Sequence, residues 1–153
     1  MRPDQLVKAY GETVGLPDLG FSANGSLVLV FGTDEKIYIE ADQSQDKIML
    51  HIEAGSIPSS KPQLLKHLLE ANIYYTGSGD CVLAMGSSSE VIVLLSLTGA
   101  ELELEHFVGA LEKLLEEAFY WRSLILNNNI DLSTEKNEAE PFTNQDSMSW
   151  LMA

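Results

Sequence analysis

Three histidines and one cysteine are the residues of this chain best suited to metal binding or nucleophilic catalysis. His51, His67 and His106 are scattered along the sequence and do not stand at His-Glu-x-x-His or another short metal-ligand spacing. Cys81 would act as a nucleophile only if a histidine folded beside it. It lies in an apolar run, where small buried cysteines are common. The sequence therefore predicts no metal, no cofactor and no catalytic residue.

Two further patterns were candidates for chemistry. Gly77-Ser78-Gly79 follows a predicted helix and precedes a predicted strand. A phosphate-binding loop has the opposite order, because its N–H groups face the ligand from the start of a helix. The glutamates between residues 101 and 117 lie off the apolar side of a helical pattern, which indicates a solvated face rather than a paired acid and base. These residues favour a binding module over an enzyme.

Charge and length narrow the class of protein. The 153 residues include 23 acidic and 9 basic side chains, a formal net charge of −14 at pH 7. Such a charge disfavours nucleic acid and anionic membrane surfaces as partners and favours a basic partner. The length suits one domain with a hydrophobic core, but not two.

The sequence predicts a protein of the cytoplasm. A single cysteine excludes an internal disulfide and fits a reducing compartment. Charged residues Asp4, Lys8 and Glu12 interrupt any signal-like apolar run. No apolar stretch approaches the roughly 18 residues that span a bilayer.

Residues 60–77 predict a helix around which the other elements are arranged. Ser60 and Gln63 form a capping-box pattern at its start, and Gly77 suits its C-terminal end. Its apolar positions repeat at helical spacing and are numbers 64, 65, 68, 69 and 73. This wide apolar surface fits either a plain core helix or a helix that contacts both the sheet and a second partner.

Five strand-like runs and two more helices complete the pattern. Strands are expected at 27–31, 36–40, 47–52, 81–85 and 91–97. Short polar connections join the first three, which predicts an antiparallel meander. Helices are expected at 4–15 and from a capping box at Thr98–Glu101 to about Leu126. The order helix, three strands, helix, two strands, helix predicts an α+β domain, an antiparallel sheet packed by helices.

The composition changes after Leu126 and divides the chain into a domain, 1–126, and a C-terminal tail, 127–153, expected to be mobile. Most of the tail is polar, which suits disorder. Its apolar end at Met148, Trp150, Leu151 and Met152 fits either a docking element or a frayed terminus.

Several short motifs stand in the order found in a known family. Leu64-Leu65-x-x-Leu68-Leu69-x-Ala71-Asn72 precedes Thr76-Gly77, two strands and a helix that contains Ala118-Phe119-Tyr120-Trp121-Arg122. Near the N-terminus, a helix precedes Gly15-Leu16-Pro17 and the strand-like segments 21–31 and 37–40. Over roughly residues 4 to 126, the chain resembles the class I type III secretion chaperones, the Tir chaperone family.

The resemblance implies a non-enzymatic, acidic, cytoplasmic homodimer. Such a dimer binds the N-terminal segment of one or more secreted effector proteins and keeps it extended, soluble and competent for secretion. The resemblance also suggests the ATPase of the secretion system as a partner, and neither nucleic acid nor membrane. Effector contact is expected at Leu6, Tyr10, Val14, Leu16, Phe21, Leu27 and Leu29. Dimer contact is expected at Leu65, Leu68, Leu69, Asn72 and Ile73.

Two alternatives stay open on the sequence alone. A relative of this fold can scaffold a regulatory or housekeeping complex without ever meeting an effector. The other alternative is an enzyme that uses Cys81 or a histidine. Co-purification of an otherwise insoluble secreted protein would distinguish the chaperone from the scaffold, and an intact phenotype after Cys81→Ser would argue against the enzyme.

Overall fold

The computed structural model describes residues 1–42, 44, 46–73, 77–78 and 80–127. Its elements follow in the order α1 (Pro3–Thr13), β1 (Ser26–Phe31), β2 (Glu35–Asp42), β3 (Lys47–Ser56), α2 (Pro62–Ala71), β4 (Val82–Met85), β5 (Glu90–Thr98), the 3-10 helix η2 (Gly99–Glu101) and α3 (Leu104–Leu126). This order confirms the predicted α+β fold. Apart from Asn127, the predicted tail lies outside the described residues.

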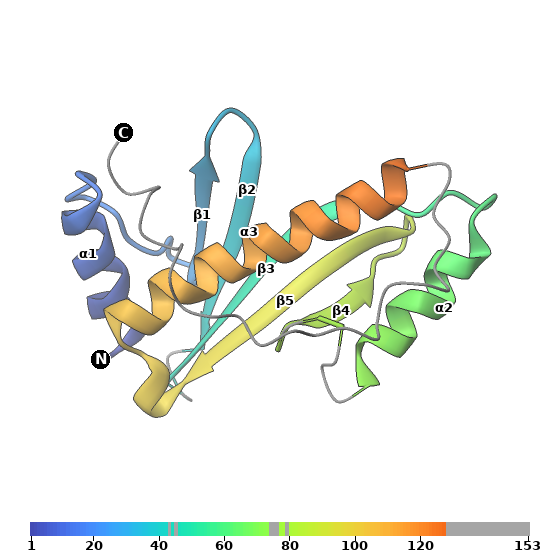
Figure 1. Ribbon diagram of the computed structural model, residues 1–153. Coiled ribbons are helices and arrows are strands. Elements are labelled where there is room, and N and C mark those ends of the chain that lie inside the picture. The colour runs from blue at the N-terminus through green and yellow to red at the C-terminus, as the bar shows by residue number, and fades with distance from the viewer. Residues whose placement is uncertain (43, 45, 74–76, 79, 128–153) are drawn as a thin grey trace, which may run out of the picture.

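The five strands form one antiparallel sheet in the order β1-β2-β3-β5-β4 (Figure 1). The first three strands are the predicted meander. The chain then passes through α2 to the edge strand β4, and β5 returns between β4 and β3. The two edges of the sheet, β1 and β4, therefore come from different halves of the chain.

One face of the sheet is apolar and is covered by α3. Alternate residues of the inner strands point to this face, as the period of a pleated strand requires. The helix α3 crosses the sheet diagonally (Figure 1), and α1 lies beside its first half. The core is thus organised around α3 rather than around residues 60–77. The buried sheet residues include Ile37, Ile39, Ile48, Leu50, Ile52, Val91 and Val93, and the buried residues of α3 include Phe107, Leu111, Leu114, Ala118 and Trp121.

The helix predicted at 60–77 is shorter than expected and lies beside the edge strand β4 (Figure 1). Its N-cap is Lys61, and the predicted capping box at Ser60 is wrong, because no side chain caps this helix. Lys61 instead donates from Nζ to the carbonyl oxygens of Ile125 at 2.6 Å and Asn127 at 2.8 Å. These carbonyls end α3, where a positive charge stabilises the helix dipole.

The capping box at Thr98 forms as predicted, but it begins a different helix. The Glu101 carboxylate accepts hydrogen bonds from the Thr98 N–H at 3.0 Å and the Thr98 hydroxyl at 3.2 Å. These bonds cap η2, and α3 begins only at Leu104.

Candidate binding surface

The structure divides the seven residues predicted to contact an effector into core and surface. Leu6 is fully buried, and the Tyr10 ring meets the edge of Phe107 with ring centroids 5.2 Å apart. Burial raises the pKa of the Tyr10 hydroxyl. Val14 and Leu16 are 47% and 52% exposed. Leu29 is buried, and Phe21 and Leu27 are half-buried.

A tight loop after α1 presents the exposed members of this set. The Leu16 N–H donates to the Gly11 carbonyl oxygen at 2.7 Å, which folds the chain back against the helix. A side chain at Gly11 would place its Cβ 2.4 Å from the Leu16 carbonyl oxygen, so this approach requires glycine. The loop residues Gly15 to Leu19 line a shallow depression of about 310 Å³.

The edge strand β1 lacks the charged residues and prolines that commonly protect a sheet edge. Its sequence, Ser-Leu-Val-Leu-Val-Phe, has no charged residue and no proline. Natural edges are usually blunted by such residues, because their free N–H and C=O groups attract other strands. At six residues, β1 is also long enough to pair with an added strand.

The hydrogen bonds at Ser26 show which groups of β1 point outward. The Ser22 N–H donates to the Ser26 carbonyl oxygen at 2.8 Å, and the Ser26 N–H donates to the Ser22 Oγ at 3.2 Å. Because outward and inward residues alternate in an antiparallel ladder, Val28 and Val30 also direct their N–H and C=O groups outward. In the part of the chain that the structure describes, these groups have no partner.

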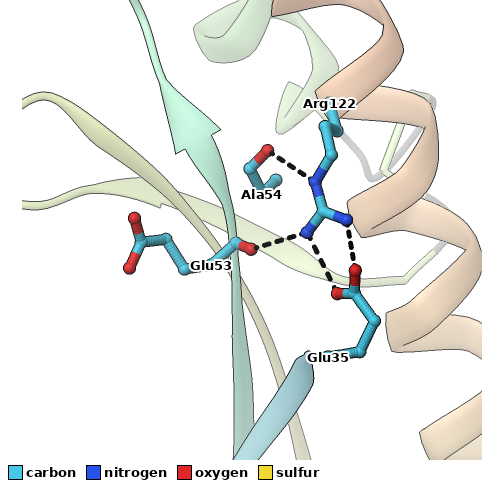
Figure 2. A network of polar contacts seen from close by, with 4 residues as sticks. All are labelled: Glu35, Glu53, Ala54 and Arg122. Carbon is cyan, nitrogen blue, oxygen red and sulfur yellow. Dashed lines mark hydrogen bonds and ion pairs between the residues drawn. The ribbon is translucent and has the colours of Figure 1, made fainter. Parts of the chain in front are cut away.

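A salt bridge fixes the hairpin that carries this edge (Figure 2). Both guanidinium Nη atoms of Arg122 on α3 bind the carboxylate of Glu35 at the start of β2, with Nη2 3.0 Å from Oε2. Arg122 also donates to the carbonyl oxygens of Glu53 at 3.3 Å and Ala54 at 3.4 Å, beside a bulge in β3. The hydrogen bond from Arg122 holds the pKa of Glu35 below its usual range. One side chain thus joins α3, β2 and β3.

The residues predicted to form the dimer contact also differ in their burial. Leu68 is buried in the core, whereas Leu69 and Ile73 are 65% and 56% exposed. Leu65 is half-buried and stands one turn before Leu69, so these three residues form a stripe along the outer side of the α2 segment. Asn72 does not belong to this stripe, because its amide bonds the backbone of β4.

The sheet face opposite α3 carries an apolar row that the sequence reasoning missed. One side chain from each strand contributes to the row, in register: Val28, Tyr38, His51, Leu94 and Val82. Tyr38 and His51 stack with ring centroids 5.0 Å apart. Their positions alternate with those of buried residues, which is the signal that identifies this second face.

Metal binding and nucleophilic catalysis by Cys81 find little support among the described residues. Among the described residues, no three histidine, cysteine, aspartate or glutamate side chains are grouped so as to hold a metal. Burial, with a smaller contribution from the Glu117 carboxylate, raises the pKa of the Cys81 thiol to about 11. A thiol with so high a pKa carries little thiolate at neutral pH and is a poor nucleophile.

Solved structures with the same fold define the class of protein. The chain superposes with a TM-score of 0.70 on a chain of the ExsC–ExsE complex, at 19% identity, covering 82% of this chain and 97% of that one. For the Yersinia pestis type III secretion chaperone SycH, crystallised with a fragment of YscM2, the TM-score is 0.64 at 15% identity, covering 77% and 98%. For the HopA1–SchA chaperone–effector complex it is 0.67 at 16% identity, covering 78% and 91%. The fold is that of a class I type III secretion chaperone.

Residues 5–122 match the Tir chaperone protein (CesT) family, and the chain belongs to this family. It is 26% identical over 151 residues to the Tir chaperone of Escherichia coli O111:H-, covering 95% of this chain and 93% of that relative. It is 24% identical over 153 residues to the Tir chaperone of Citrobacter freundii, with the same coverage. The resemblance noted in the motifs is confirmed, and the family is one of chaperones, not enzymes.

None of the helices among the described residues is both long and apolar enough to span a bilayer.

Proposed function

We propose that this chain is a cytoplasmic type III secretion chaperone that binds the N-terminal segment of a secreted effector and keeps it extended. The observation that carries the proposal is the uncharged, open edge of β1, with the outward groups of Val28 and Val30. Family membership and the fold shared with chaperone complexes support the same function.

In this proposal, the effector segment adds to the sheet as a further strand beside β1. Its backbone pairs with Val28 and Val30, and its apolar side chains cover the exposed surface at Val14 and Leu16. Strand addition takes affinity from main-chain hydrogen bonds and specificity from apolar pockets. Ordering a flexible segment costs about 2–5 kcal/mol of the gross interaction energy, so both kinds of contact are needed. The net charge of −14 attracts basic effector segments.

The proposal includes a homodimer. Leu69 and Ile73 are exposed in the single chain, and Leu65 beside them is half-buried against the core, so this stripe is the surface offered to a second copy. Two copies double the surface available to the effector. An extended segment needs this surface, because it is too long for one small domain to contact along its whole length.

Val30→Pro tests strand addition at the edge. Proline is tolerated on an edge strand where the lost N–H points to solvent, so the variant should fold. Val30→Ala is the matched control, because it removes the same side chain but keeps the N–H donor. In pull-downs from the native cell, Val30→Ala should retain the secreted protein that the wild type captures, and Val30→Pro should lose most of it.

Equal capture by a folded Val30→Pro variant would rule out pairing at this edge. If the wild type instead captures a housekeeping complex and no secreted protein, the chain is a scaffold of the same fold.

A further inference from the structure

The two edge strands of the sheet, β1 and β4, differ in how open their outward backbone groups are to an added strand. Any edge strand presents free N–H and C=O groups, so β1 and β4 are both potential templates. On β4, however, the Asn72 side chain occupies the middle of the edge. Its Nδ2 donates to the Leu83 carbonyl oxygen at 2.9 Å, and its Oδ1 accepts from the Leu83 N–H at 2.9 Å.

The amide of Asn72 reproduces the two hydrogen bonds that a neighbouring strand would make with Leu83. The β4 strand has only four residues, and by alternation Leu83 and Met85 are the ones that direct their backbone groups away from β5. The Cys81 N–H, next in the same alternation, donates to the Ser78 carbonyl oxygen at 2.8 Å. No two successive outward residues of β4 are therefore fully open to an added strand.

Asn72 is held in this position by the helix before it. It directly follows α2, which is anchored by the buried side chains of Leu64, Leu68 and Ala71. The amide therefore does not need to be ordered anew when it bonds Leu83, and an incoming strand would have to displace a preorganised group.

We propose that the Asn72 side chain closes the β4 edge and so directs strand addition to β1. This inference rests on the proposed function, which places the effector at β1. Closure of β4 would also prevent copies of the protein from assembling without limit through their sheet edges. If both edges were open, β1 of one copy could pair with β4 of the next, and such head-to-tail contacts give open filaments unless the rotation between copies closes a ring.

The test uses the full chain and reads self-association, so it does not depend on an effector. Asn72→Ala removes both hydrogen bonds and should produce species larger than the wild type, increasing with concentration, in sedimentation velocity. Adding Val30→Pro to the same chain should restore the wild-type size, because the β1 template is then blocked.

Asn72→Asp separates edge closure from a purely structural role. The aspartate loses the donor to Leu83, but it places a charge on the edge, which keeps other strands away. This variant should therefore keep the wild-type size, whereas a structural role predicts similar damage from Ala and Asp.

Three results would overturn the proposal. The first is a folded Asn72→Ala variant of unchanged size at high concentration. The second is association that persists with Val30→Pro, because that association would not involve the β1 edge. The third is failure of both Asn72→Ala and Asn72→Leu to fold, which would make the amide a requirement of folding. A failure of effector capture by the wild type would count against the proposed function alone.

Discussion

Glu35→Gln should destabilise the protein measurably, because it weakens the contact that holds the β1–β2 hairpin on α3. The glutamine keeps the shape of the side chain but loses the charge and presents an NH₂ group to one guanidinium N–H donor of Arg122. Arg122 then keeps its bonds to the backbone of Glu53 and Ala54 but has no carboxylate partner.

The expected magnitude follows from the burial of the pair. The side chains of Arg122 and Glu35 are 32% and 23% exposed. Exposed pairs contribute about 0–1 kcal/mol, and removing one partner of a fully buried pair costs about 3–5 kcal/mol. An intermediate pair in a bidentate arrangement should contribute about 2 kcal/mol, which lowers the melting temperature by about 4–8 °C in a domain of this size.

Thermal unfolding followed by circular dichroism at several pH values provides the assay. Because the folded-state pKa of Glu35 is lowered, its stabilising effect is present above the ordinary pKa of a glutamate and is lost as pH falls through the lowered value. The difference between the wild type and Glu35→Gln should therefore be full at pH 7 and shrink below about pH 4.

Glu70→Gln is the matched control, since Glu70 pairs with Lys66 on an open helix face where the two side chains are 53% and 80% exposed. It should change the free energy of unfolding by less than about 0.5 kcal/mol. A Glu35→Gln effect no larger than that of Glu70→Gln, or one that is undiminished at pH 3, would refute the reasoning.

Three further predictions concern the dimer, the cysteine and the tail. Leu69→Asp should convert the proposed homodimer to a folded monomer in light scattering, because Leu69 is 65% exposed in the single chain, whereas Leu68→Asp should unfold the protein; a Leu69→Asp dimer would exclude this stripe. Cys81 should react with a thiol reagent at pH 8 far more slowly than in denaturant, because its thiol is buried with a pKa of about 11; equal rates would show an open site. A chain shortened to residues 1–127 should keep its melting temperature within about 2 °C, because the polar tail is expected to add little to the core; a larger fall would indicate that Trp150 or its neighbours dock on the domain.

The strands were predictable because their signals are local. The apolar runs at 47–52 and 91–97 lie within β3 and β5 of the structure. Their pairing was not predictable in the same way, because α2 and β4 lie between β3 and β5 in the chain, although the two strands are neighbours in the sheet. The role of the residue that follows α2 was equally hidden, since the Asn72 side chain bonds the backbone of β4, which lies further along the chain.

The candidate surface could be predicted only in part, since apolar periodicity does not say what covers a residue. Tyr10 suits either an interface or a core, and its contact with Phe107, far along the chain, decides for the core. The helical pattern of α2 likewise did not separate the buried Leu68 from the exposed Leu69. The pair of Glu35 and Arg122 joins residues 87 positions apart, which no short motif reveals.

Amide hydrogen exchange on the complex with the captured effector tests the central claim most directly. Our account predicts that exchange at the Val28 and Val30 amides slows strongly when the effector binds, while exchange at the Met85 amide on the opposite edge does not change. Unchanged exchange at Val28 and Val30 in a saturated complex, or new protection at Met85 instead, would contradict it.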